Sequence, residues 1–153
     1  MIYLDNAATT FQKPAAVQRA VMQAMRTMSS PGRGGYAAAQ QAEETLFRCR
    51  SAAAALFSVP SVEQVVFTMN ATHALNIAIK SLVRPGGRVV ISGYEHNAVT
   101  RPLHALGAEV IVAAAPLFSP PETVSAFERA LALRPDAAVC THCLLYTSPS
   151  PRD

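Results

Sequence analysis

The sequence contains no tryptophan, only three cysteines, and charged side chains at 15% of its 153 positions. So few cysteines exclude a disulfide-stapled scaffold. A hydrophobic content of 50% excludes a disordered tail or a collagen-like fibre. The length and the hydrophobic content suit one domain, which at this length can bury roughly 68–70% of the surface of its unfolded chain.

Targeting and polyanion-binding signals are also missing. No stretch offers about 18 consecutive apolar residues, so no membrane span is predicted. The N-terminus lacks a basic region followed by an apolar run, so we expect a cytoplasmic location. The net charge of +3 is scattered along the chain, and we therefore expect neither a nucleic-acid partner nor a membrane partner.

The last residues of the sequence, CLLYTSPSPRD at 143–153, differ from the alanine-rich chain before them. They resemble the translation of a transposase adapter used to prepare DNA libraries, and the alternative is a natural Pro/Ser-rich linker. We expect 143–153 to be an adapter-derived artefact and exclude it from the fold. Residues 1–142 are then expected to be a truncated, N-terminal fragment of a longer parent protein.

Hydrophobic periodicity predicts two helices near the N-terminus. Pro14 is suited to the first turn of one helix. This helix is expected to end at the turn-forming segment SSPGRGG, residues 29–35. A second helix is expected over about Ala37–Phe57, and Pro60 stops it. We therefore treat 1–60 as an N-terminal arm with helices.

From residue 61 to 142 the pattern changes to an alternation of short apolar strands and helices. Such alternation predicts an α/β fold, with a mainly parallel sheet and flanking helices. Strands are expected at Gln64–Thr68, Arg88–Ser92, Glu109–Ala113 and Ala137–Thr141. Helices are expected at Thr72–Val83, Asn97–Leu106 and Glu122–Leu133.

Ligands of such sheets bind outside the carboxyl ends of the strands, which here are residues 69–73, 93–97 and 141–142. The first of these places opens a helix, where free N–H groups and the Thr72 hydroxyl form a ready phosphate site. The alternative is an ordinary helix cap made by Asn70 or Thr72. The glycine-rich fingerprint of a P-loop or dinucleotide fold is missing, so any phosphate would belong to another ligand.

The second place carries His96 directly after Glu95. A histidine at the carboxyl end of a strand can stack on a planar ligand or move protons. The alternative is a capping or surface histidine. The residues alone leave both interpretations open.

Four segments carry a more specific pattern: YLDNAATT at 3–10, PGRGGY at 31–36, VVFTMNATHALNIAIKSL at 65–82 and EHNAVTRPL at 95–103. Together they resemble the class V aminotransferase family, and within it the cysteine desulfurase-like branch. The resemblance extends over nearly all of residues 1–142. It implies an enzyme that depends on pyridoxal 5'-phosphate (PLP) and has the aspartate-aminotransferase-like fold (PLP fold type I). Residues 61–142 would be part of its PLP-binding large domain.

The same resemblance implies roles for individual residues. Ala71 and Thr72 match the turn that binds the cofactor phosphate, and His96 matches a catalytic histidine that stacks on the pyridine ring and assists proton transfer. Positions that match the substrate pocket are Asn6, Ala7, Ala8 and Arg33. The family usually has Glu where this chain has His73, which changes the charge beside the phosphate turn. No metal is implied.

The implied reaction converts L-cysteine to L-alanine and leaves the sulfur on an enzyme cysteine as a persulfide. A homodimer and a sulfur acceptor protein are implied as well. The Schiff-base lysine, the aspartate at the pyridine nitrogen and the nucleophilic cysteine of the family have no match in this chain. The candidates read instead as surface, turn or core residues: Lys13, Lys80, Asp5, Asp136, Cys49 and Cys140. We therefore expect the fragment itself to be inactive.

Three alternatives stay open. One is a class V aminotransferase or a selenocysteine lyase-like enzyme of the same fold. Another is a non-catalytic α/β domain that binds a phosphate-containing ligand. The last is an interaction fragment, whose exposed sheet edges would make it prone to aggregate.

Overall fold

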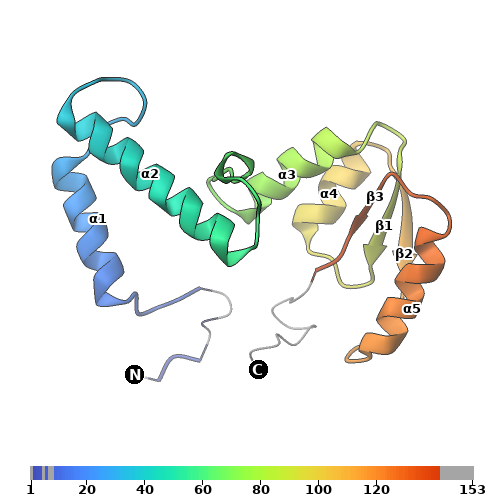
Figure 1. The fold of residues 1–153 in the computed structure, drawn as a ribbon. Helices are drawn as coiled ribbons and strands as arrows, with labels where there is room; N and C mark the ends of the chain where they lie inside the picture. Colours follow the sequence, from blue (N-terminus) through green and yellow to red (C-terminus); the bar gives the residue numbers. More distant parts are fainter. Residues whose placement is uncertain (1, 5, 7–8, 142–153) are drawn as a thin grey trace. The chain divides into compact units, whose positions relative to one another are not determined.

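The computed structural model describes residues 2–4, 6 and 9–141. The chain forms two compact units, the first up to Phe67 and the second from Thr68, and each is described by itself (Figure 1). The expected division into an N-terminal arm at 1–60 and part of a PLP-binding large domain at 61–142 stays a prediction. The segment 143–153, expected to derive from an adapter, lies outside the described residues.

The first unit contains both predicted N-terminal helices, α1 (Ala15–Thr27) and α2 (Ala37–Leu56), followed by a 3-10 turn at Val62–Gln64. Pro14 stands directly before α1, where its fixed φ suits a helix start. Helix α1 buries none of its residues. Helix α2 buries only small side chains, those of Ala39, Ala42 and Ala54.

The second unit is a parallel sheet in which helices make the connections. Its elements are α3 (Ala71–Leu82), β1 (Arg88–Ser92), α4 (Asn97–Ala105), β2 (Glu109–Ala113), α5 (Pro120–Leu131) and β3 (Ala137–Val139). The strand order is β2-β1-β3, so β1 is central, with its Val90 opposite Ile111 of β2 and Ala138 of β3. The predicted α/β fold with a mainly parallel sheet and flanking helices is confirmed.

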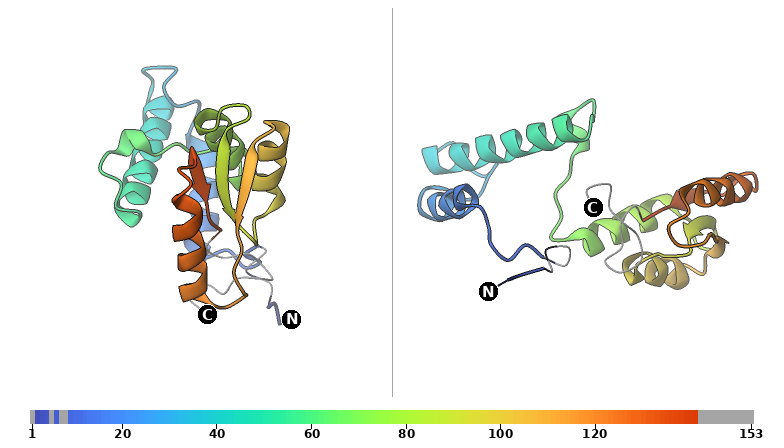
Figure 2. Two further views of the ribbon diagram at one scale, coloured as in Figure 1. Left: turned by 90° about the vertical axis from the view of Figure 1, so that its right-hand side faces the viewer. Right: turned by 90° about the horizontal axis from the view of Figure 1, so that it is seen from below.

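Helices α3 and α4 cover one face of this sheet and α5 covers the other (Figure 2). Successive side chains of a strand point to opposite faces, so β1 contributes to a core on each side. The core under α3 and α4 consists of Ile79, Val83, Val89, Ile91, Val99 and Leu103. The core under α5 consists of Val90, Ala113, Ala126 and Ala130. Strand β1 is thus buried on both faces, as in other parallel sheets.

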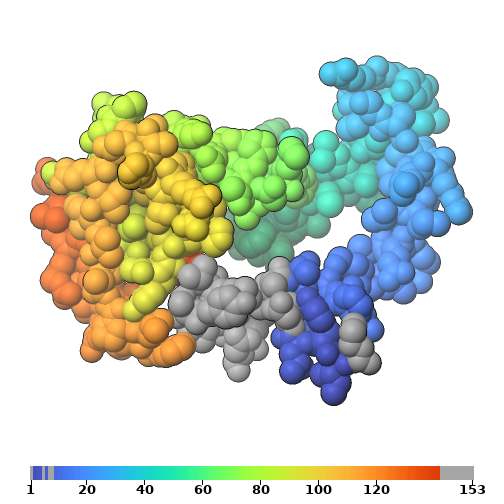
Figure 3. All heavy atoms as spheres, turned by 180° about the vertical axis from the view of Figure 1, so that it is seen from behind, coloured from blue at the N-terminus to red at the C-terminus, as the bar shows by residue number. Residues whose placement is uncertain are grey.

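Strand β2 lies at one edge of the sheet, and its atoms reach the surface beside those of α4 (Figure 3). Val110 and Val112 of this strand are accordingly exposed to 40% and 51%.

The strand expected at Gln64–Thr68 is a wrong prediction. The segment ends the 3-10 turn and continues without strand structure, and Val66 is 71% exposed. Valines favour extended backbone, but a strand also needs a neighbour to complete its hydrogen bonds. Within the described residues the strands pair only among β1, β2 and β3. The last expected strand is shorter than predicted, because β3 ends at Val139.

Candidate functional site

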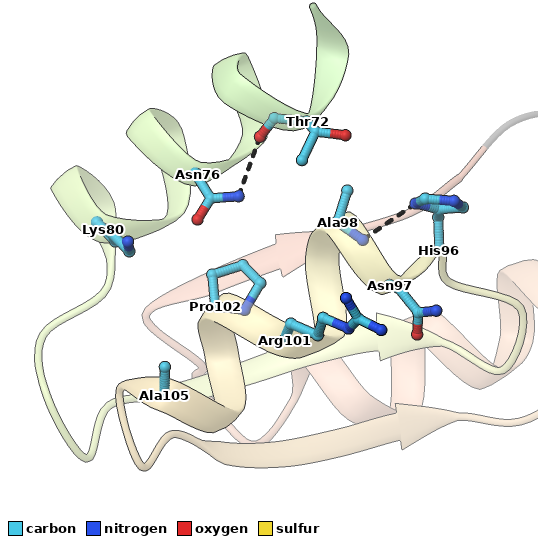
Figure 4. A pocket seen from close by; sticks show the side chains of 9 residues that line it. All are labelled: Thr72, Asn76, Lys80, His96, Asn97, Ala98, Arg101, Pro102 and Ala105. Carbon is cyan, nitrogen blue, oxygen red and sulfur yellow. Dashed lines mark hydrogen bonds between the residues drawn. The ribbon is translucent and has the colours of Figure 1, made fainter.

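A groove of about 430 Å³ lies between α3 and α4 (Figure 4). Helix α3 lines it with Thr72, Asn76 and Lys80, whose spacing of four residues places them on one face of the helix. The α4 side is formed by His96, Asn97, Ala98, Arg101, Pro102 and Ala105. The structure therefore brings Thr72 and His96, predicted from two separate strand ends, to the same groove.

The start of α3 is capped by Asn70. Its side-chain oxygen accepts a hydrogen bond from the N–H of His73 at 2.9 Å, so the expected cap is present. Within the described part of the chain, the N–H groups of Ala71 and Thr72 and the Thr72 hydroxyl have no hydrogen-bond partner. A cap and an anion site are therefore compatible here, because Asn70 leaves these donors free at the positive end of the helix. Phosphate binding by Ala71 and Thr72 stays a prediction.

His96 caps the start of α4. Its Nδ1 accepts a hydrogen bond from the N–H of Ala98 at 3.0 Å, which is the capping role that sequence reasoning left open. Because Nδ1 is an acceptor, this hydrogen bond assigns the proton of the neutral ring to Nε2. The side chain is exposed, so Nε2 is accessible to a ligand in the groove. Stacking on a cofactor and proton transfer stay predictions.

The third expected place, at residues 141–142, connects to the second. The N–H of Thr141 donates to Oε1 of Glu95 at 2.7 Å, and the Thr141 hydroxyl donates to Oε2 at 2.6 Å. The exits of β1 and β3 are thereby joined by side-chain hydrogen bonds. His142 lies outside the described residues.

The expectation that Cys49 and Cys140 are core residues is wrong, because both are free thiols at exposed positions. Helix α2 buries alanines instead, and Cys140 follows the short strand β3. Partial desolvation raises the pKa of the Cys140 thiol, and the nearby negative charge of Glu95 raises it further. A thiol with a raised pKa is less often the nucleophilic thiolate at neutral pH.

The other predicted site residues belong to the first unit. Asn6 lines a small hollow of about 130 Å³ near the N-terminus. Arg33 is exposed in the connection between α1 and α2. Ala7 and Ala8 lie outside the described residues. The substrate-binding roles of all four stay predictions.

Sequence reasoning missed three residues of the groove, Asn76, Lys80 and Arg101. A signal for two of them was present, because Thr72, Asn76 and Lys80 form a polar stripe at helical spacing. Among the residues that the structure describes, no three His, Cys, Asp or Glu side chains gather as a metal site would require. Over the same residues, no helix combines the length and hydropathy needed to cross a bilayer.

Comparison with known proteins identifies relatives over most of the chain. The sequence pattern of the family described as aminotransferase class-V matches residues 2–134. A cysteine desulfurase of Pectobacterium carotovorum subsp. carotovorum is 28% identical over 102 residues, which cover 64% of this chain and 25% of that enzyme. Cysteine desulfurase IscS of Neisseria meningitidis serogroup A is 32% identical over 116 residues, covering 71% of this chain and 28% of that enzyme.

The structural comparison agrees. The apo structure of cysteine desulfurase from Thermococcus onnurineus NA1 is similar with a TM-score of 0.64 and 25% identity, over 72% of this chain and 29% of that one. This supports the predicted PLP fold type I. The chain spans about a quarter of the length of the curated relatives it matches. Because the family pattern matches nearly all of the sequence, the chain belongs to the aminotransferase class-V family.

Proposed function

We propose that the longer parent protein of this chain acts as a PLP-dependent cysteine desulfurase, which converts L-cysteine to L-alanine and transfers the sulfur to an enzyme cysteine as a persulfide. The observation that carries the proposal is the presence of Thr72 and His96 on one groove, at the starts of α3 and α4. The similarity of the chain to enzymes named cysteine desulfurase supports the same activity. We further propose a cytoplasmic homodimer with a sulfur acceptor protein as partner.

The groove fits the phosphate of PLP. The free N–H groups of Ala71 and Thr72 and the Thr72 hydroxyl provide donors at a helix N-terminus, which favours a dianion. Lys80 and Arg101 add positive charge along the same groove. When bound, PLP supplies an electron sink for the substrate.

His96 would hold or transfer a proton at Nε2. Its Nδ1 is occupied by the Ala98 N–H, so the ring keeps one tautomer while Nε2 stays available. In the first unit, we propose that Asn6, Ala7, Ala8 and Arg33 contribute to the substrate pocket. The planar guanidinium of Arg33 would suit the carboxylate of an amino acid.

We also propose that these 153 residues by themselves do not catalyse the reaction. Lys13 lies in the first unit and donates to the backbone oxygen of Thr10. Lys80 lies near the end of α3, two helical turns from Thr72. The described thiols, Cys49 and Cys140, are outside the groove.

The activity is tested on the protein encoded by the intact gene, with retained PLP and the alanine formed from L-cysteine as readouts. Thr72→Val should weaken PLP binding about tenfold, the usual effect of losing a hydrogen bond to a charged group. His96→Ala should lower kcat by about 10²–10⁴-fold. The matched control Thr45→Val, on an exposed turn of α2, should change neither. Transfer of the amino group to a keto acid, without release of sulfur, would indicate the aminotransferase instead. Binding of phosphate ligands without any turnover would indicate the non-catalytic domain.

The inactivity of the 153-residue chain has its own test. The chain is incubated with PLP, reduced with borohydride and mapped by mass spectrometry. We expect no specific PLP mass at Lys13 or Lys80. A stoichiometric adduct at Lys80, lost in Lys80→Ala, would contradict the proposal.

A further inference from the structure

The loop that carries His96 is held at the exit of the central strand by a buried serine. Ser92, the last residue of β1, is 5% exposed. Its hydroxyl donates to Oε1 of Glu95 at 2.5 Å and accepts from the N–H of Tyr94 at 3.3 Å. The loop therefore turns back onto its own strand before α4 begins.

Glu95 then joins this loop to β3. Its two carboxylate oxygens accept hydrogen bonds from both the N–H and the hydroxyl of Thr141. With Ser92, three donors converge on one half-buried carboxylate, and hydrogen bonds to an ionised acceptor are the strong ones. Among the described residues, no Lys, Arg or His side chain forms an ion pair with Glu95. The carboxylate thus serves as a hydrogen-bond acceptor that connects two strand ends.

Tyr94 ties the same loop to the other neighbour of β1. Its hydroxyl donates to the backbone oxygen of Ala115, two residues beyond the end of β2. Tyr94 and Glu95 are adjacent in the sequence, yet they contact the exits of the two strands on either side of β1: Tyr94 that of β2, and Glu95 that of β3. The residue that follows them is His96, whose ring is fixed from the other side by the Ala98 N–H.

We propose that Glu95 is a positioning residue for His96. Its carboxylate fixes the backbone just before the histidine, so that Nδ1 stays on the Ala98 N–H and Nε2 stays available to the groove. The role of His96 in catalysis rests on the proposed function, whereas its positioning by Glu95 rests on the contacts of this chain alone.

The test measures the histidine directly on the full chain, without cofactor. Long-range proton–nitrogen spectra identify the protonated ring nitrogen, and hydrogen exchange reports on the Ala98 amide. The unaltered chain should show His96 with its proton on Nε2. Glu95→Ala should mix the two tautomers and speed the exchange of the Ala98 amide about tenfold, as expected for loss of strong hydrogen bonds.

Two variants separate positioning from general destabilisation. Glu95→Gln should restore both signals, because its amide oxygen can accept from Ser92 and the Thr141 N–H while its NH₂ donates to the Thr141 hydroxyl. Glu109→Ala removes a carboxylate from the edge strand, where it pairs with Arg88, and should leave His96 unchanged. If Glu95→Ala fails to fold, Thr141→Val takes its place, with an expected rise of about threefold in Ala98 exchange.

An unchanged tautomer and unchanged Ala98 exchange in a folded Glu95→Ala chain, or in Thr141→Val where that variant replaces it, would overturn the inference. An effect of the same size in Glu109→Ala would overturn it as well. Failure of the intact protein to use L-cysteine would instead contradict the proposed function. It would not change what the His96 tautomer and the Ala98 exchange say about positioning by Glu95.

Discussion

Asn70 offers a way to separate the stability of α3 from the ability of its first turn to bind an anion. Its side-chain oxygen holds the His73 N–H, and the free N–H groups of Ala71 and Thr72 are next to it. Asn70→Ala removes this cap and should lower the free energy of unfolding by about 1 kcal/mol. Asn70→Asp keeps an acceptor in the same place and adds a negative charge.

The added charge has opposite effects on stability and on binding. At a helix N-terminus it should stabilise the free chain by about 0.3–1 kcal/mol. Toward a phosphate dianion at about 5 Å in water it should be repulsive by ~1.5 kcal/mol, or about tenfold in affinity. Asn70→Asp is therefore expected to be at least as stable as the unaltered chain and to bind phosphate about ten times more weakly.

Urea unfolding followed by circular dichroism measures the stability, and shifts of the Ala71 and Thr72 amide signals during titration with PLP measure the affinity. Inorganic phosphate serves as a second probe, since it contains the same charged group without the ring. Undiminished affinity in Asn70→Asp would refute the placement of the phosphate at the start of α3. A large loss of stability in the same variant would refute the capping argument.

Two further predictions concern the second unit. Leu103 is fully buried under α3 and α4, so Leu103→Ala should destabilise this unit by about 2–5 kcal/mol in urea unfolding, and a loss below about 1 kcal/mol would contradict the core described here. The raised pKa of Cys140 should move the pH midpoint of its alkylation above the ordinary thiol value, which peptide mapping of the alkylated chain measures. Glu95→Gln removes the negative charge and should move that midpoint down, so an unchanged midpoint would show that Glu95 does not act on the thiol.

Much of the second unit could be predicted because its elements carry local signals. Apolar runs such as Arg88–Ser92 and Glu109–Ala113 are bounded by turns, and both strands have the predicted bounds. The segment Gln64–Thr68 has a similar composition but no partner within the described residues, and its prediction as a strand is wrong. Composition thus reports the preference of a segment, whereas pairing decides whether it becomes a strand.

The candidate site was predictable at Thr72 and His96, since both follow apolar runs where a helix begins. The support around His96 was not, because Glu95 and Thr141 are separated by 46 positions and meet only through the strand order. The prediction that Cys49 and Cys140 are core residues failed for a different reason. Their side chains suit either environment, and the burial of a thiol on α2 depends on which face of the helix finds a neighbour.

The central position of β1 has a consequence for synthesis on the ribosome. The strand and His96 are translated before either neighbouring strand exists, and Thr141 follows Glu95 after another 46 residues. At ~5–20 residues per second this interval lasts about 2–9 s. During it the nascent chain carries the histidine without the bonds that hold its loop to the third strand. The histidine is thus synthesised well before the residue that holds its loop to β3. A translational pause between Glu95 and Thr141 would prolong the interval in which the loop lacks these hydrogen bonds.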